Sequence, residues 1–189
     1  MRNYEDRAKD FIKMLFPLID DCQDVWDFRE AVEMFNRVYT RKVRCNNGIA
    51  RVAFISSDYV VKLEYDPYEV RCVGGGENEV KMYAIAEQEG FAYLFAKVTP
   101  YDYNGKRFYI MPRIHGIGKF EYDYADEHMT EAECEFCDRH QISDLHCNNY
   151  GFRNGHVCII DYACNKNDSY FLDSETSCSF HTSSNNFSS

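Results

Sequence analysis

The sequence lacks long apolar runs. No stretch of 18 or more apolar residues occurs among its 189 residues. A membrane-spanning helix needs about 20 consecutive apolar residues, so none is predicted. Residues 1–6 lead into a charged amphipathic stretch instead of the apolar core of a signal peptide. We therefore expect a soluble protein that stays in the cytoplasm and does not bind a membrane.

Clusters of basic residues are missing as well. The chain has 31 acidic and 21 basic residues, which gives a formal net charge of −10. No group of Lys and Arg side chains forms a stripe that a phosphate backbone could follow. We therefore expect no direct binding of nucleic acid through a broad basic surface.

The cysteines do not form a disulfide pattern. Nine cysteines are scattered along the chain, an odd number, in a sequence long enough to build its own hydrophobic core. We interpret them as reduced, with several serving as small apolar core residues. Apolar residues make up 45% of the chain and aromatic residues 16%, which predicts a folded globular protein.

The apolar pattern predicts an α+β protein that begins with a helical extension over residues 1–40. The helical pattern covers residues 4–39, with an interruption near 17–21 and Asp24 as the predicted N-cap of the second part. A β pattern follows, with a helix over 77–89 and the turn signal Asn104-Gly105. The predicted strands are 42–45, 49–55, 59–65, 91–98 and 106–111.

The C-terminal part predicts one more helix and two short strands. A capping-box signature at Thr130 begins a helix that runs to about residue 140. The two strands are predicted on either side of Asn154-Gly155. Residues 173–189 are rich in Ser and Thr without periodicity, so we predict a disordered tail.

A lysine inside an apolar strand is the first candidate functional residue. Lys62 follows two valines, where an ammonium group is costly unless an anion meets it. Glu79, on the helix after the third strand, is a candidate to hold that ammonium while it contacts nucleotide phosphates. Together these two residues predict part of a phosphate-binding site.

Three oxygen-bearing side chains follow in the C-terminal part. Asp144 lies on a predicted loop, Asn149 comes five residues later, and Asp161 ends an apolar strand. Two carboxylates and an amide in this order suit one general base and two oxygen ligands of a hard cation. The cation that these residues predict is Mg²⁺.

Taken together, these motifs resemble the protein-kinase-like superfamily. Lys62 and the two valines before it resemble the lysine motif of the third strand, and Glu79 resembles the glutamate of the next helix. Asp144-Leu145-His146 with Asn149 resembles the catalytic loop. Asp161 and the Tyr-Ala pair after it stand where the family has Asp-Phe-Gly. The order of the motifs and their predicted structural contexts carry the resemblance.

The resemblance implies a two-lobed protein-kinase-like fold. The N-lobe would span 41–114 and contain a five-stranded antiparallel sheet. A reduced, minimal helical C-lobe would span 115–172, because only 28 residues follow Asp161. Such compactness is what we expect of a kinase encoded by a bacteriophage or a similar mobile genome, acting in the host cytoplasm.

The resemblance also implies a role for each matching residue. Asp144 would accept the proton of the substrate hydroxyl, Lys62 would bind the nucleotide phosphates, and Asn149 and Asp161 would hold Mg²⁺. The segment 108–114 resembles the hinge that meets adenine through its backbone. The residues implied in ATP binding are Lys62, Glu79, Gly48, Met111 and Arg113.

The function implied is a Ser/Thr protein kinase that uses ATP and Mg²⁺, with a protein substrate or a regulatory protein as its partner. Two departures leave a pseudokinase open, a protein of the same fold that works by docking. The loop expected to cover the phosphates keeps one glycine, Gly48, and the late helices of a full C-lobe are missing. His146, where protein kinases usually have Lys, favours a kinase of small molecules instead.

A zinc-stapled interaction module is a further alternative. Cys134, Cys137 and His140 recur every three residues on the predicted helix, which places them roughly on one face. Structural zinc sites usually take a Cys-x-x-Cys pair from a turn, so we favour core packing for these cysteines.

Overall fold

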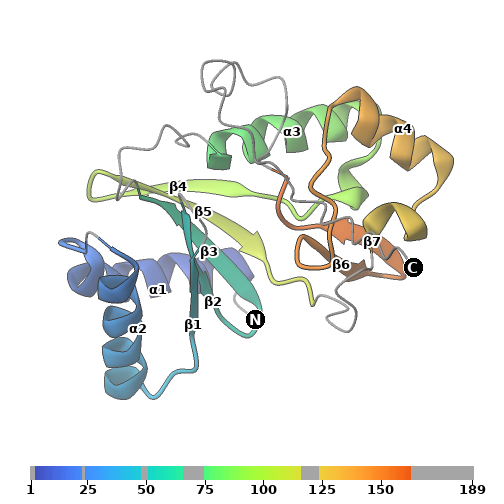
Figure 1. Cartoon of the computed structure of the whole chain (residues 1–189). Coiled ribbons are helices and arrows are strands. Elements are labelled where there is room, and N and C mark those ends of the chain that lie inside the picture. The colour runs from blue at the N-terminus through green and yellow to red at the C-terminus, as the bar shows by residue number, and fades with distance from the viewer. Residues whose placement is uncertain (1–2, 23, 48–50, 66–74, 116–123, 163–189) are drawn as a thin grey trace, which may run out of the picture.

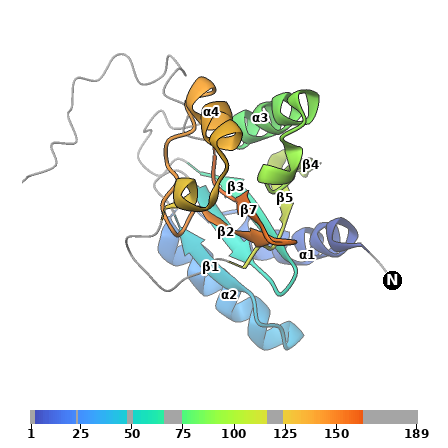
Figure 2. The ribbon, with the colours of Figure 1, turned by 90° about the vertical axis from the view of Figure 1, so that its right-hand side faces the viewer.

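The computed structural model describes residues 3–22, 24–47, 51–65, 75–115 and 124–162. Within these ranges the chain has an α+β fold, with a five-stranded antiparallel sheet, a separate two-stranded hairpin and four α-helices. Helices α1 and α2 cover one face of the large sheet, and α3, α4 and the hairpin lie on the other side (Figures 1 and 2). The predicted α+β class and antiparallel sheet are confirmed.

Helices α1 (Tyr4–Ile19) and α2 (Val25–Tyr39) form the predicted N-terminal pair, but the break begins at residue 20, later than the predicted 17–21, because Pro17 lies inside α1. The Asn3 side chain accepts a hydrogen bond from a backbone N–H in the first turn of α1. Asp24 caps α2 as predicted, in a capping box with Asp27. These caps fix where the two helices begin, because the first N–H groups of a helix have no partner within it.

The strands of the large sheet lie in the order β1-β2-β3-β5-β4, and all neighbours are antiparallel. Their bounds are β1 Arg44–Asn47, β2 Arg51–Ile55, β3 Tyr59–Glu64, β4 Thr99–Tyr103 and β5 Lys106–Pro112. Asn104 and Gly105 both have positive φ, 47° and 80°, and form the predicted two-residue turn between β4 and β5.

The strand predicted over 91–98 is wrong. This segment contains the short 3-10 helix η1 (Ala92–Leu94), and the strand that pairs with β5 begins later, at Thr99. Phe95 makes an isolated parallel bridge to Ile159 of β7 (His156–Ile159). The apolar run therefore packs against one face of the large sheet and does not form one of its strands. β4 itself is an edge strand in which no residue is fully buried, and its polar pattern resembles a loop in sequence.

Helix α3 (Gly75–Glu89) begins earlier than the sequence predicted. Gly76, which precedes the predicted start of the helix at residue 77, lies in the first turn of α3, where its N–H donates to Glu64 Oε1 at 2.7 Å. A Cβ atom at Gly76 would collide with the ring of Tyr109 on β5. Glycine therefore lets α3 approach the sheet closely at this point. The helix ends at Glu89, as predicted, and Gly90 follows it with φ 84°.

The C-terminal elements follow the predicted order. A short 3-10 helix, η2 (Ala125–His128), precedes α4 (Glu131–Arg139), which begins with the expected capping box at Thr130. Strands β6 (Tyr150–Arg153) and β7 (His156–Ile159) form the hairpin predicted around Asn154-Gly155. The tail predicted to be disordered, 173–189, lies outside the described residues.

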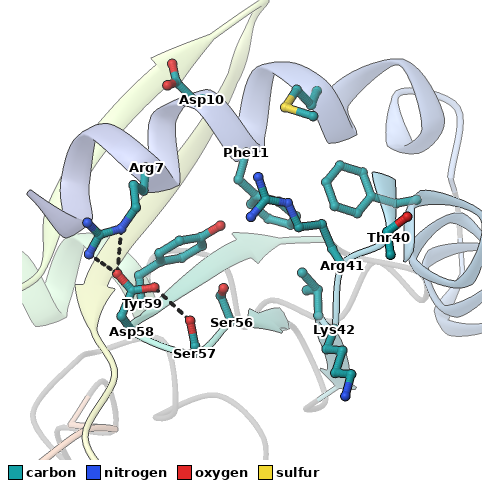
Figure 3. A pocket seen from close by; sticks show the side chains of 13 residues that line it. Arg7, Asp10, Phe11, Thr40, Arg41, Lys42, Ser56, Ser57, Asp58 and Tyr59 are labelled. Carbon is teal, nitrogen blue, oxygen red and sulfur yellow. Dashed lines mark hydrogen bonds and ion pairs between the residues drawn. The ribbon is translucent and has the colours of Figure 1, made fainter. Parts of the chain in front are cut away.

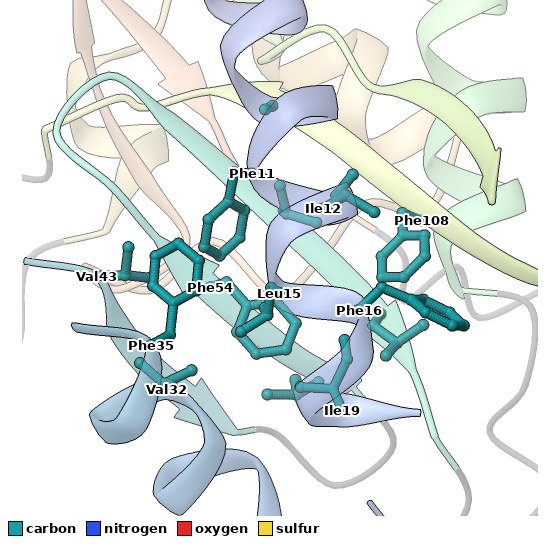
Figure 4. Close-up of a cluster of buried hydrophobic side chains, with 14 of the residues drawn as sticks. Phe11, Ile12, Leu15, Phe16, Ile19, Val32, Phe35, Val43, Phe54 and Phe108 are labelled. Carbon is teal, nitrogen blue, oxygen red and sulfur yellow. The ribbon is translucent and has the colours of Figure 1, made fainter. Parts of the chain in front are cut away.

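The helical extension shares a hydrophobic core with the sheet. Phe11 of α1 packs its ring 5.1 Å from that of Phe35 on α2 and 6.1 Å from that of Phe54 on β2 (Figure 4). Other side chains of α1, α2, β3 and β5 complete this first cluster. Helices α1 and α2 therefore cover a sheet face that would otherwise expose large aromatic side chains.

A second hydrophobic cluster lies on the opposite face of the sheet. Its buried members come from α3, η1, β5, η2, α4, β6, β7 and the segments that flank them, and include Met82, Phe95, Met111, Phe136 and Ile159. Because successive side chains of a strand point to opposite faces, β5 contributes Phe108 and Ile110 to the first cluster and Tyr109 and Met111 to the second.

We predict that Phe11→Ala lowers the free energy of unfolding by about 3–5 kcal/mol, because it removes a fully packed ring from the first cluster. Trp26→Ala is the matched control. The Trp26 side chain is 72% exposed, so its loss should cost less than about 1 kcal/mol. Urea unfolding monitored by circular dichroism measures both. Equal effects would mean that α1 is not part of the core.

Candidate functional site

The alternation of strand side chains places two cations on the same face of the sheet. In β3, Val61 and Leu63 belong to the first hydrophobic cluster, so Lys62 between them points to the face of α3. In β2, Arg51 and Ala53 point the same way, and Ala53 is the direct register partner of Lys62. Arg51 therefore lies diagonally beside Lys62.

Lys62 and Glu79 form a buried ion pair. Lys62 Nζ lies 2.6 Å from Glu79 Oε1, and the exposed fractions of the two side chains are 8% and 0%. Helix α3 brings Glu79 to the sheet through its close approach at Gly76. Lys62 Nζ also donates to the carbonyl oxygen of Ile160, at 3.0 Å. The ammonium thus joins β3, α3 and the segment after β7.

Arg51 completes the cluster, and sequence reasoning missed it. Its guanidinium donates to Glu79 Oε1 at 3.0 Å and to Asp161 Oδ1 at 2.6 Å. Lys62 Nζ lies 3.9 Å from the same Asp161 oxygen. Two cations and two carboxylates therefore meet at one place, and we call Arg51, Lys62, Glu79 and Asp161 the ion-pair cluster.

The cluster shifts the pKa values of its members. Burial raises the pKa of Glu79, and the adjacent Lys62 and Arg51 oppose that shift. Burial alone would also raise the pKa of Asp161, but Lys62 and Arg51 outweigh it and hold that pKa at about 2. Burial lowers the pKa of Arg51, and the two carboxylates more than reverse this. Asp161 and Arg51 are thus both held in their charged forms.

One carboxylate oxygen of the ion-pair cluster could accept a hydrogen bond that the described residues do not supply. Within the described residues, Glu79 Oε2 is buried and has no hydrogen-bond partner. Buried carboxylate oxygens usually accept at least one hydrogen bond. A ligand or a water molecule that donates a hydrogen bond would therefore gain a partner here.

The predicted catalytic loop adjoins the cluster through the backbone. The carbonyl oxygen of Asn149 accepts hydrogen bonds from the N–H groups of Ile160, at 2.7 Å, and Asp161, at 3.4 Å. The Asn149 side chain, which is 8% exposed, donates from Nδ2 to the carbonyl oxygen of Asp144 at 3.0 Å. A continuous chain of contacts therefore runs from Lys62 to Asp144.

Asp144 presents its carboxylate to solvent. The side chain is 49% exposed, and Oδ1 lies 3.3 Å from His146 Nε2. The same His146 nitrogen lies 3.2 Å from Asn149 Nδ2, so the three side chains of the loop contact one another. An exposed carboxylate next to an imidazole is accessible to a substrate hydroxyl group.

Tyr162 anchors the segment that carries Asp161. Its hydroxyl donates to the carbonyl oxygen of Ala96 at 2.7 Å, and its ring packs edge-on against Phe95. The Tyr162 side chain is buried in the second hydrophobic cluster. Asp161 is therefore held between a buried aromatic residue and the backbone of Asn149.

The remaining predicted ATP contacts have different surroundings. Met111 is buried on the same sheet face as Lys62, in register with Val60. The Arg113 guanidinium donates to the carbonyl oxygen of Ser56 at 2.7 Å, so it holds the β2–β3 turn and not the cluster. Gly48 lies outside the described residues.

The proposed zinc ligands make other contacts. His140 Nε2 lies 3.0 Å from Glu89 Oε1, and Cys134 Sγ lies 3.9 Å from the carbonyl oxygen of Asp126. Cys137 is 1% exposed in the second cluster, and burial raises the pKa of its thiol to about 12. In the part of the chain that the structure describes, no three His, Cys, Asp or Glu side chains are arranged to hold a metal ion.

A separate pocket lies on the other side of the sheet. It has a volume of about 560 Å³ and lies between α1, the α2–β1 connection and the β2–β3 turn (Figure 3). Its wall includes Phe11, Arg41 and Tyr59, together with an ion pair between Arg7 and Asp58. The pocket contains no residue of the ion-pair cluster, so it is distinct from the site predicted from sequence.

No helix in the described ranges has both the length and the apolar character needed to cross a bilayer. The chain matches no protein-family model, and it matches no curated protein sequence.

We predict that the cluster stabilises the fold in a pH-dependent way. Because the pKa of Asp161 is depressed from its ordinary 3.8 to about 2, its carboxylate stabilises the folded state above pH 3.8, and this contribution disappears as the pH falls towards 2. The side chain is 38% exposed, so Asp161→Asn should cost about 1 kcal/mol or less near neutral pH. Urea unfolding at several pH values measures the difference between the two proteins, which should shrink on acidification.

Proposed function

We propose that this chain is a compact ATP-dependent phosphotransferase with a two-lobed protein-kinase-like fold, which transfers the γ-phosphoryl group to Ser or Thr hydroxyls of proteins. The observation that carries the proposal is the contact of Lys62 with Glu79 and Asp161, three residues chosen from sequence for this role. They come from β3, α3 and the segment after β7, which are far apart in the chain.

The chemistry of the cluster supports nucleotide binding. Lys62 is a cation fixed by two hydrogen bonds, to Glu79 and to the carbonyl oxygen of Ile160. A fixed cation at the edge of a buried site stabilises the negative charge of nucleotide phosphates. Met111, buried on the same sheet face, is a candidate to contact the adenine ring.

The loop of Asp144 supports phosphoryl transfer. Its carboxylate is exposed, contacts His146 and is linked through Asn149 to the backbone of Asp161. In the proposed reaction Asp144 orients the acceptor hydroxyl and accepts its proton as the oxygen attacks the γ-phosphorus. ADP leaves as the bond to the γ-phosphoryl group breaks, and the protein substrate retains that group.

The described residues do not fit a bound Mg²⁺ in this arrangement. Asp161 Oδ1 accepts a hydrogen bond from Arg51 at 2.6 Å, and the Asn149 side chain donates within its own loop. A hard cation needs several oxygen ligands free of other cations. We therefore route no step of the proposed reaction through a metal ion.

The second candidate function is a pseudokinase that works by docking to a regulatory protein. Arg51 favours it, because an arginine bonded to both carboxylates neutralises the site without any ligand. The two candidates differ in one measurable property. The enzyme transfers phosphate from labelled ATP to protein, whereas the pseudokinase transfers none.

We predict that Lys62→Met weakens ATP binding about tenfold or more, because it removes a cation at the phosphates. Arg51 still neutralises Glu79 in this variant, so the fold should persist. Calorimetric titration with ATP measures affinity, and thermal melting checks the fold. Lys13→Met, which changes an exposed lysine of α1, is the control and should bind as wild type does. Unaltered affinity of a folded Lys62→Met protein would remove the proposed phosphate contact.

We also predict that Asp144→Asn lowers phosphoryl transfer on the order of 10²- to 10⁴-fold while ATP affinity stays nearly constant, because an amide cannot accept the substrate proton. Transfer of label from ATP to proteins of a cell lysate measures the rate. Asp138→Asn, on the exposed side of α4, should leave it unchanged. If wild type binds ATP and transfers no label, the pseudokinase function replaces the enzyme.

A further inference from the structure

The Arg51 guanidinium lies beside the two carboxylates, Glu79 and Asp161, that a bound metal ion would approach in the proposed site. Its guanidinium lies against Asp161 Oδ1 at 2.6 Å and Glu79 Oε1 at 3.0 Å. The Arg51 side chain is 18% exposed, so it is largely removed from solvent. It is therefore an integral part of the cluster rather than a surface residue that happens to lie close to it.

The ion-pair cluster contains as many cationic as anionic side chains. Lys62 and Arg51 carry two positive charges, and Glu79 and Asp161 carry two negative charges. A divalent cation added to this set without a nucleotide would leave an excess of positive charge in a partly buried site. Such an excess is unfavourable where solvent screens charges weakly.

A divalent cation and Arg51 would also compete for the same carboxylate. Asp161 has a second oxygen, but an ion bound there would share one carboxylate with the guanidinium and be repelled by it. Two cations already surround that carboxylate, Arg51 at 2.6 Å and Lys62 at 3.9 Å, and they also depress its pKa. The oxygen is free for a metal only after Arg51 has left.

We propose that Arg51 is a built-in counter-ion that competes with divalent cations for Asp161, so that in the resting site Asp161 is not a ligand for Mg²⁺ and becomes one only when the Arg51 side chain moves away. This inference rests on the proposed nucleotide-binding function and adds its regulation. In the resting site, Arg51 holds β2, α3 and the segment of Asp161 together. Any interaction that draws its guanidinium outward, such as a partner's carboxylate, makes Asp161 available to the metal.

While Arg51 holds Asp161, Mg²⁺ should not strengthen the binding of ATP to the wild-type protein. The experiment is a calorimetric titration of full-length protein with ATP, once in excess MgCl₂ and once in EDTA. We expect the two wild-type affinities to differ by less than about threefold. A stronger dependence of the wild-type protein on Mg²⁺ would overturn the inference, and this measurement requires no variant.

Removing the guanidinium should restore the metal dependence. In Arg51→Met, Lys62 still pairs with Glu79, and Asp161 loses its 2.6 Å hydrogen bond and keeps only the 3.9 Å contact with Lys62. We expect Mg²⁺ to raise the ATP affinity of this variant about tenfold or more, the effect of freeing a carboxylate from a charged hydrogen bond. Arg51→Lys keeps the charge and should keep most of the wild-type behaviour. Arg44→Met, at an exposed position of β1, is the matched control.

The outcomes separate this inference from the proposed function. If no protein in the series binds ATP under either condition, the proposed nucleotide site is wrong and the inference fails with it. If wild type and Arg51→Met bind ATP with the same response to Mg²⁺, the site stands and the role of Arg51 is refuted. A gain of metal dependence in Arg51→Met that Arg51→Lys does not share supports both.

Discussion

The carboxylate of Glu79, which has no exposed surface, is the constraint on which the rest of the site depends. An ionised carboxylate without water is tolerated only when cations and hydrogen bonds replace its hydration. Lys62 and Arg51 supply those cations from neighbouring strands, and α3 must pack closely on the sheet to bring Glu79 within their reach. Asp161 balances the second cation. The positions of the helix, two strands and the C-terminal segment are thus coupled through one buried negative charge.

The large sheet separates two environments. On one face, the buried cluster formed by the described residues of the strands and the N-terminal helices contains aromatic and aliphatic side chains and no charged one. On the other, the ion-pair cluster lies beside the second hydrophobic cluster. The period-two alternation of strands lets β3 serve both, because Val61 and Lys62 are adjacent in sequence but point to opposite faces. A charged site can therefore be built without opening the main core.

Local signals in the sequence predicted much of the fold, because caps and tight turns depend on a few adjacent residues. Asp24, Thr130 and the Asn-Gly turns are examples. The polar edge strand β4 was missed, since its residues pack on one side only and resemble a loop. Lys62, Glu79 and Asp161 were found because each matched a motif, whereas Arg51 lies in a strand with ordinary alternation, and its partners, 28 and 110 residues away, give no local signal. One signal in the sequence could have identified Arg51. The turn at residues 56–58 pairs β2 with β3 in a register that places Arg51 diagonal to Lys62.

The link between the two predicted catalytic segments is made by main-chain atoms. The carbonyl oxygen of Asn149 accepts from the backbone N–H groups of Ile160 and Asp161, and no side chain takes part in either bond. Substitutions at these positions that preserve the backbone path leave both bonds intact. A chain of this fold can therefore lose its reactive side chains through successive substitutions and still keep the two segments in the same relative position.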